Sequence, residues 1–359
     1  MIVADRWEHG SEFHWPLGGS AEVDLGRRPW DDNGVLLGSG RDALRLVIAH
    51  GRKQHGWERL WVPSYMCQHV VESLVMTGIS CQVYEDAPTQ PGPTAATLTP
   101  AAKDVVLVVN YFGLRDASSL EGLKLGQASL LLDHTHDPLS AWAHDDGADY
   151  AICSLRKTVP IPDGGALWSP KGHPLPVAPE ITKVRALAAQ SKWKAMRLKG
   201  HYLAGELVNK ADFRALAADG ESDMARGEIS GVYPASEARL AGLRLGTWRT
   251  QRRLNHDAFA LALEGAAGLS VLTGVDTSCP FSAFVVFEQH EVCARVRAAL
   301  IEASIYPAVL WPMDTPVLEG VSEGHRALSR LSLSVHCDMR YDQADMRRVA
   351  EVIRQALAS

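Results

Sequence analysis

The strongest constraint on the fold is the segment DVVLVVN at residues 104–110, an unbroken aliphatic run between two polar residues. A strand without polar alternation is typical of the centre of a parallel sheet that is covered on both faces. Further strands are predicted where shorter apolar or alternating runs occur, at residues 60–63, 79–84, 129–133, 150–154 and 165–168. Segments with helical spacing separate several of these runs, which predicts right-handed crossovers and an α/β sheet that binds ligands at the carboxyl ends of its strands.

The remainder of the chain predicts a second, smaller unit. Residues 181–264 are expected to be mostly helical, with a break at 227–234, and a mixture of strands and helices follows them. A length of 359 residues suits two domains. We therefore expect a large α/β domain at 1–240, with an N-terminal arm at 1–35, and a smaller α+β domain at 241–359.

Composition excludes several classes of protein. The formal net charge of −6 and the pI near 6.2 argue against nucleic acid as a partner. No apolar run approaches the ~18 residues of a membrane span, and the polar N-terminus has no secretory apolar region, so the protein is expected to be soluble and cytoplasmic. The six cysteines show no C-x-x-C spacing, and no metal is expected, although residues 134–137 (HTHD) leave a metal site as a weak alternative.

Two polar features fall where such a sheet places a ligand. The turn Gly38-Ser39-Gly40 opens the first predicted helix, and free backbone N–H groups there, with the helix dipole, suit a phosphate. The alternative is a tight turn with no ligand. Asp133 ends the predicted strand at 129–133 and needs a partner if it is buried. It either pairs with a protonated pyridine nitrogen or caps a helix.

The third feature is Lys157, just past the predicted strand at 150–154. It lies in SLRKTVPIPDGG, where two prolines and two glycines restrict the backbone. A lysine held beside a cation or in an apolar pocket is a nucleophile for a carbonyl, whereas a lone lysine is more often a surface residue. The hydroxyl of Ser154 is placed to bind a phosphate. The order and spacing of the three features favour one joint site.

In this order and spacing, the chain resembles the DegT/StrS-like (DegT/DnrJ/EryC1/StrS) aminotransferases, which are fold-type I enzymes that depend on pyridoxal 5′-phosphate (PLP). The resemblance runs from about residue 35 to the C-terminus. Its matching segments are GSGRDAL at 38–44, VPSY at 62–65, NYFG at 110–113, Leu132-Asp133, SLRK at 154–157 with Gly164-Gly165, and SVHCDM at 334–339. It implies an α/β fold like that of aspartate aminotransferase, with a mixed, mostly parallel sheet between helices.

The resemblance also implies a role for each residue. Lys157 would hold PLP as a Schiff base and carry protons during the reaction, and Asp133 would pair with the pyridinium. Gly40, Arg41 and Ser154 would bind the phosphate, mostly through backbone N–H groups and one hydroxyl, and His136 would lie near the phenolic oxygen of the cofactor. Lys157 and Asp133 are thus the predicted catalytic residues.

Three positions depart from the family pattern. Arg41 replaces the usual threonine of the phosphate turn, where it adds charge or points elsewhere. Cys67 falls where an aromatic residue normally stacks on the cofactor ring, so that stacking is weaker or comes from Tyr65. The family's Asn-x-Arg motif, which reaches across a dimer, falls on residues 232–234, which read VYP. The partner's phosphate contact would then come from Ser230 or Ser236.

The resemblance therefore predicts an aminotransferase that moves an amino group from an amino donor to a keto acceptor, a nucleotide-linked sugar or another biosynthetic intermediate. Two alternatives remain: a PLP-dependent lyase or dehydratase of the same fold, and a non-catalytic PLP-binding relative. A homodimer with shared active sites is implied, and no membrane or nucleic-acid partner is expected. Substrate recognition would involve residues such as Arg156, Arg226, Trp311 and His336, each of which has a structural alternative.

Overall fold

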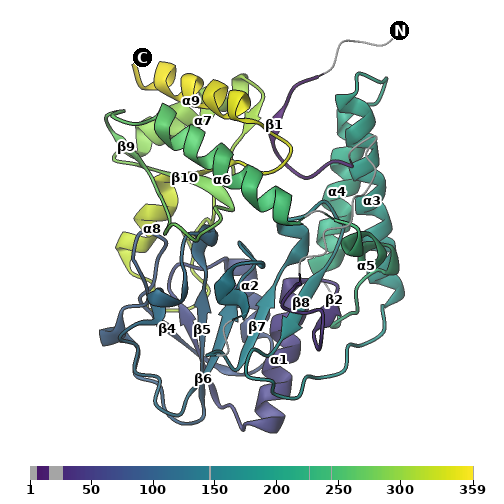
Figure 1. Ribbon diagram of the computed structural model, residues 1–359, viewed down its shortest axis with the longest axis vertical. Coiled ribbons are helices and arrows are strands. Elements are labelled where there is room, and N and C mark those ends of the chain that lie inside the picture. Colours follow the sequence, from purple (N-terminus) through teal and green to yellow (C-terminus); the bar gives the residue numbers. More distant parts are fainter. Residues whose placement is uncertain (1–5, 16–26, 145–146, 226, 244, 359) are drawn as a thin grey trace.

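The computed structural model describes residues 6–15, 27–144, 147–225, 227–243 and 245–358. Parts of the predicted N-terminal arm, residues 1–5 and 16–26, and Arg226 therefore lie outside the described residues. The chain forms a large sheet with helices around it, a pair of long helices beside that sheet, and a smaller C-terminal unit (Figure 1). No helix in the described segments is both long and apolar enough to cross a membrane.

The large sheet has seven strands in the order β2-β8-β7-β6-β5-β3-β4. Five neighbours, β7, β6, β5, β3 and β4, are parallel, and β8 runs antiparallel to both β7 and β2. Their bounds are β2 (Val35–Leu37), β3 (Arg59–Pro63), β4 (Ser80–Tyr84), β5 (Asp104–Val109), β6 (Ser129–Asp133), β7 (Tyr150–Cys153) and β8 (Gly165–Trp168). Every residue of β5 is buried, which confirms the prediction of a strand covered on both faces. The mixed, mostly parallel sheet is as expected.

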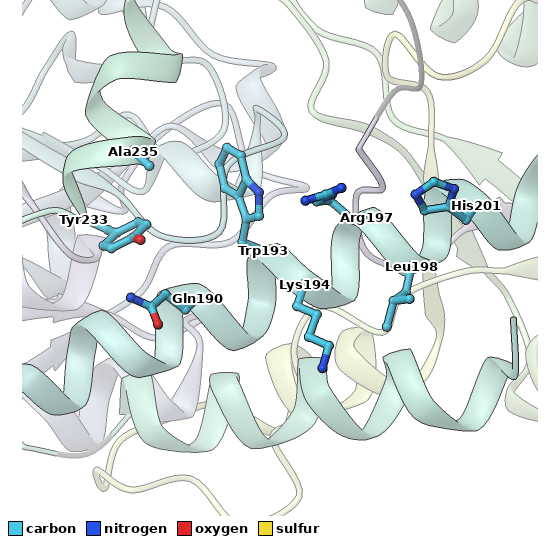
Figure 2. A pocket seen from close by; sticks show the side chains of 8 residues that line it. All are labelled: Gln190, Trp193, Lys194, Arg197, Leu198, His201, Tyr233 and Ala235. Carbon is cyan, nitrogen blue, oxygen red and sulfur yellow. The ribbon is translucent and has the colours of Figure 1, made fainter.

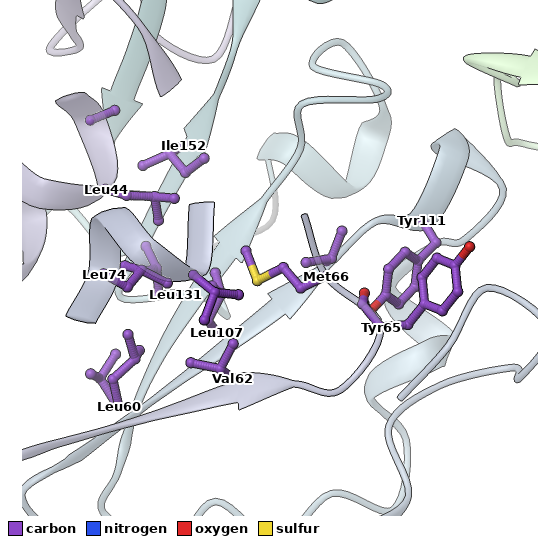
Figure 3. Close-up of a cluster of buried hydrophobic side chains, with 14 of the residues drawn as sticks. Leu44, Leu60, Val62, Tyr65, Met66, Leu74, Leu107, Tyr111, Leu131 and Ile152 are labelled. Carbon is purple, nitrogen blue, oxygen red and sulfur yellow. The ribbon is translucent and has the colours of Figure 1, made fainter. Parts of the chain in front are cut away.

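The core between the sheet and helix α1 (Gly40–Gln54) follows from the apolar spacing of that helix. The hydroxyl of Ser39 caps α1 by accepting a hydrogen bond from the backbone N–H of Asp42. Leu44 and neighbouring apolar residues of α1 pack against strand residues such as Leu131 (Figure 3). This packing holds α1 against β7 and β8. Its first residue, Gly40, lies against Ser154, which follows β7, and the preceding Ser39 lies against Gly165 at the start of β8.

The next helix is shorter than the sequence indicates. A helix is expected at residues 65–77, yet α2 covers only Gln68–Val75. The backbone N–H groups of Ser64 and Tyr65 instead donate to the carbonyls of Tyr84 and Asp86. The chain therefore continues beside β4 in an extended form before it turns into the helix.

The middle of the chain is helical, as predicted, and forms a hairpin of α3 (Lys183–Leu203) and α4 (Lys210–Ala225) that pack side by side (Figure 1). After the break come α5 (Pro234–Ala241) and α6 (Leu245–Ala262). A buried ion pair connects the hairpin to the sheet domain, because Nη2 of Arg185 on α3 lies 2.6 Å from both carboxylate oxygens of Asp42 on α1.

The C-terminal unit has a three-stranded antiparallel sheet, β12-β10-β9, with its own hydrophobic core. Helices α6, α7 and α9 pack on this unit. Near the N-terminus, β1 (His9–Gly10) pairs in parallel with β11, so that this segment crosses to the C-terminal unit (Figure 1). The remaining elements are β9 (Leu269–Val271), β10 (Ser282–Phe287), α7 (His290–Glu302), β11 (Ile305–Tyr306), α8 (Glu323–Arg330), β12 (Ser332–His336) and α9 (Gln343–Ala358).

His134 follows β6 and is fully buried between Trp142 and Trp168. Neither of its ring nitrogens has a hydrogen-bond partner among the described residues. Burial lowers the pKa of His134 from its ordinary value of 6.5 to about 3. The ring is therefore neutral in the folded protein at every pH where the protein is normally handled.

We predict that His134→Phe makes the protein less sensitive to acid. In the unfolded chain this histidine gains a proton below pH 6.5, whereas in the folded chain it stays neutral, so the wild type loses stability as the pH falls from 6.5 toward 3. At pH 5 this loss is about 2 kcal/mol for His134 alone. Urea unfolding at pH 8 and pH 5 measures the difference, and an equal loss in both proteins would contradict the prediction.

Candidate active site

The carboxyl ends of β6 and β7 bring together the predicted site residues that lie far apart in the sequence. Asp133 is the last residue of β6, and Lys157 lies in the short 3₁₀ turn η5 (Leu155–Lys157) that follows β7. The positive charge of Lys157 lowers the pKa of both Asp133 and His136, opposing burial at Asp133 and adding to it at His136. His136 and Lys157 line one cavity, and Asp133 lies beside Ile152 of β7, so that all three residues follow neighbouring strands at the edge where a sheet of this kind binds its ligand.

Asp133 is held by its neighbours and remains half-buried. Burial raises the pKa of its carboxyl group, against the opposite effect of hydrogen bonds from Thr135 and of the charge on Lys157. The backbone N–H of Thr135 donates to Oδ1 of Asp133 at 2.8 Å. A carboxylate in this position attracts a second cation, because burial makes an incompletely paired charge costly.

His136 lines the same cavity as Lys157 and carries no charge. Its Nδ1 accepts a hydrogen bond from the backbone N–H of Phe112 at 3.1 Å. Burial, and then the charge of Lys157, lower the pKa of His136 to about 3. A neutral imidazole whose Nδ1 accepts carries its proton on Nε2. The ring stacks on Trp311, with centroids 5.9 Å apart.

The glycine turn at the start of α1 touches the lysine loop. A Cβ on Gly40 would lie 2.8 Å from Cβ of Ser154, and a Cβ on Gly165 would lie 2.4 Å from the backbone carbon of Ser39. These approaches exclude any side chain at either glycine. The structure thus places Gly40 beside Ser154 at the N-terminus of a fifteen-residue helix, whose N–H groups at Asp42 and Ala43 are bonded to Ser39.

Three other predicted cofactor-binding residues, Tyr65, Cys67 and Arg41, do not line the cavity that Lys157 lines. Tyr65 is fully buried, and its hydroxyl donates to the carbonyl of Leu310 at 2.5 Å. Figure 3 shows it in the core beside Tyr111, which disfavours Tyr65 as a residue that stacks on a ligand. Cys67 is half-buried at the start of α2. The guanidinium of Arg41 lies 3.6 Å from the carboxylate of Glu221 on α4.

The expected partner contact at Ser230 or Ser236 is wrong for this structure. Both serines are fully buried within their own chain. The hydroxyl of Ser236 donates to Asp163, and the hydroxyl of Ser230 donates to the carbonyl of Gly231 and accepts from the N–H of Thr182. The carbonyl of Ser230 accepts from the backbone N–H of Gly38. The segment that contains them therefore supports the glycine turn from inside the chain and leaves neither hydroxyl free for another subunit.

A cavity of about 360 Å³ opens beside Lys157. The sequence pointed to His136, Arg156, Trp311 and His336 among its lining residues. It did not point to Lys192 on α3 or Arg340 after β12, because no local motif marks them. The ring centroid of Trp311 lies 6.0 Å from Nζ of Lys157, so that the C-terminal unit supplies one wall and α3 another.

A second cavity, of about 380 Å³, lies along α3. Figure 2 shows Trp193 and Arg197 projecting from this helix, with Tyr233 at the start of α5 nearby. Its lining side chains are aromatic, basic, amide or aliphatic. None of the residues that the sequence assigns to the cofactor site lies in this lining.

The weak metal alternative gains nothing from the structure. Across the described part of the chain, no three His, Cys, Asp or Glu side chains gather as they would around a metal ion. Asp137, in the suspected segment, instead forms two hydrogen bonds with Arg249, at 2.8 and 2.7 Å.

No family model and no curated protein sequence matches this chain. Solved structures do match it. Spr1654 of Streptococcus pneumoniae, assigned as a sugar aminotransferase and solved in apo and PLP forms, is 13% identical over 90% of this chain and 86% of its own, with a TM-score of 0.63 for the apo form. The aminotransferase TlmJ of Streptoalloteichus hindustanus is 15% identical over 90% and 86%, with a TM-score of 0.58.

The fold is that of the fold-type I enzymes. The predicted fold class is thus confirmed. A third match is the dehydratase ColD, which is 13% identical over 89% of this chain and 88% of its own, with a TM-score of 0.60. Because transferases and a dehydratase share the fold-type I fold, the reaction has to be argued from the site residues.

We predict that Gly40→Ala destabilises the protein by about 1–3 kcal/mol, because the added methyl group forces α1 away from Ser154. Gly324→Ala is the matched control. Its Cβ would meet little on α8, and alanine favours a helix, so a gain of about 0.5–1 kcal/mol is expected. Urea unfolding of both variants tests this, and equal effects would show that the turn is not tightly packed.

Proposed function

We propose that this protein is a PLP-dependent aminotransferase of the DegT/DnrJ/EryC1/StrS family. The observation that carries the proposal is the position of Lys157, Asp133 and His136 after neighbouring strands at one edge of a fold-type I sheet, beside the turn formed by Gly40 and Ser154. The solved structures with this fold include Spr1654 in its PLP form and DesI in the presence of its TDP-sugar product.

The residues present fit each end of PLP. The amine of Lys157 faces the cavity and suits the aldehyde. The half-buried carboxyl of Asp133 suits a protonated pyridine nitrogen, and the Nε2–H of His136 suits the phenolic oxygen. The phosphate suits the turn between Gly40 and Ser154, where Ser39 already accepts from the N–H groups of Asp42 and Ala43 and those of Gly40 and Arg41 remain for a ligand.

When bound, PLP supplies an electron-poor ring that takes up the charge of a carbanion. Asp133 would keep the pyridine nitrogen protonated, and the charge of Lys157 would help to keep Asp133 ionised. The Lys157 amine would act as the base and acid that takes a proton from the reacting carbon of the substrate and returns it. His136 would fix the ring position with a neutral donor, and Trp311 would cover that part of the cavity.

We predict that Lys157→Ala abolishes amine transfer and the absorbance of lysine-bound PLP, since the variant has no amine to bind the aldehyde. The matched control is Lys124→Ala at an exposed position, which should retain both. Product analysis of the wild type with a panel of amino donors and keto acceptors separates amine transfer from loss of water or CO₂. A Lys157→Ala protein that still transfers amine would refute the assignment.

A shared-site homodimer and a cytoplasmic location also belong to this proposal. Support for the dimer is the fold, because fold-type I sites are built between two subunits in the family that the sequence resembles. We predict that the PLP-loaded protein is dimeric by light scattering. A monomer with full PLP occupancy would contradict it.

A further inference from the structure

Three cations share a single carboxylate next to the candidate active site. Glu221 on α4 lies 2.7 Å from Nη2 of Arg156, 2.6 Å from Nζ of Lys192 and 3.6 Å from Nη2 of Arg41. We call Arg41, Arg156 and Lys192 the cation cluster. Glu221 is the one carboxylate that all three cations contact among the described residues, although Asp163 also acts on Arg156 and Glu12 on Lys192 at longer range.

The helical hairpin is shaped to bring Lys192 into this cluster. A Cβ at position 220 of α4 would lie 2.5 Å from Cγ of Lys192, so that Gly220 leaves the room through which the lysine side chain passes. Lys192 is buried, with 7% of its surface exposed. A lysine placed in this way has lost most of its hydration, and the protein recovers that free energy only through paired anions.

The cations are incompletely compensated. Burial, and then the charge of Arg156, lower the pKa of both Lys192 and Arg41. The Nε of Arg156 is buried and has no hydrogen-bond partner among the described residues. Against its own burial, the cluster lowers the pKa of Glu221 to about 2. An additional anion would relieve the repulsion among the three cations.

Two members of the cluster face the cavity at Lys157. Arg156 and Lys192 line it, whereas Arg41 does not. Arg340 also lines it but is already engaged, because it binds both oxygens of Asp338 at 2.7 and 2.8 Å and the carbonyls of residues 11 and 12 at 3.1 Å. Arg156 and Lys192 are therefore the cations best placed to receive an anion that enters the cavity.

We propose that Arg156 and Lys192 bind a carboxylate or phosphate group of the substrate, in competition with Glu221. This inference rests on the proposed function, because it takes Lys157 as the reacting group in the same cavity. Glu221 has 39% of its side chain exposed, which leaves it room to withdraw from the cations. It holds them in position before an acidic substrate arrives.

The test uses protein loaded with PLP, so that the phosphate turn at Gly40 is already filled. Isothermal titration with succinate, with inorganic phosphate and with neutral succinamide measures binding to the cavity. Succinate or phosphate should bind and succinamide should not, and the tighter of the two anions identifies the acidic group. The PLP absorbance of the same samples reports on the proposed function separately.

Substitutions at Lys192 and at Glu221 should change the anion affinity in opposite directions. Lys192→Met should weaken anion binding by about tenfold or more, because a charge-assisted hydrogen bond is lost. Glu221→Gln should tighten it, because the internal competitor is gone, although the variant itself is less stable. Lys194→Met is the matched control at an exposed position of the same helix and should change nothing.

Unchanged anion affinity in Lys192→Met would overturn the proposal, as would weaker or unchanged binding in Glu221→Gln. If Lys192→Met lowers only the affinity for PLP, the cluster serves the cofactor and the substrate subsite is refuted. If Lys192→Met fails to fold by circular dichroism, Lys192→Arg and Glu221→Gln still decide the matter. Lys192→Arg keeps the charge and should retain anion binding.

Discussion

The close backbone contact between Gly40, Ser154 and Gly165 is the constraint on which the rest of the site depends. Each glycine lies where a single methyl group would collide with a neighbouring segment. Their contact presses the start of α1 against the loop that carries Lys157 and against the first residue of β8. The buried ion pair of Asp42 and Arg185 connects α1 to α3 of the helical hairpin. Residues of α3 form another wall of the cavity.

The charges of the site are arranged around two carboxylates, Asp133 and Glu221, each of them partly exposed. Asp133 meets the single charge of Lys157, which only partly offsets its burial, whereas Glu221 beyond Arg156 meets the three charges of the cation cluster. His136 is kept neutral by burial and by the nearby lysine, and it therefore adds a hydrogen-bond donor without adding charge. A site of this composition suits anionic ligands, because burial makes its excess positive charge costly until an anion pairs with it.

Much of the architecture could be predicted because strand and helix patterns are local. The aliphatic run at 104–110 became β5, and Asp133 and Lys157 were expected at strand ends because polar residues follow apolar runs there. Predictions were less accurate where the local structure depends on contacts with residues far away in the sequence. The helix expected from residue 65 begins at Gln68, since the preceding backbone is bonded to the segment after β4. Ser230 proved to be an internal support for the glycine turn.

The sequence by itself determined the order of strands and helices, the glycine turn, and the positions of Asp133, Ser154 and Lys157 along the chain. Its information is periodicity and spacing, which act over a few residues at a time. Only the tertiary structure decided that Tyr65 is a core residue, that Trp311 covers the lysine, and that Lys192 reaches the same cavity past Gly220. These placements depend on how whole helices and domains pack. No local pattern indicates that Lys192 on α3 meets the loop of Lys157, which lies about 35 residues earlier in the chain.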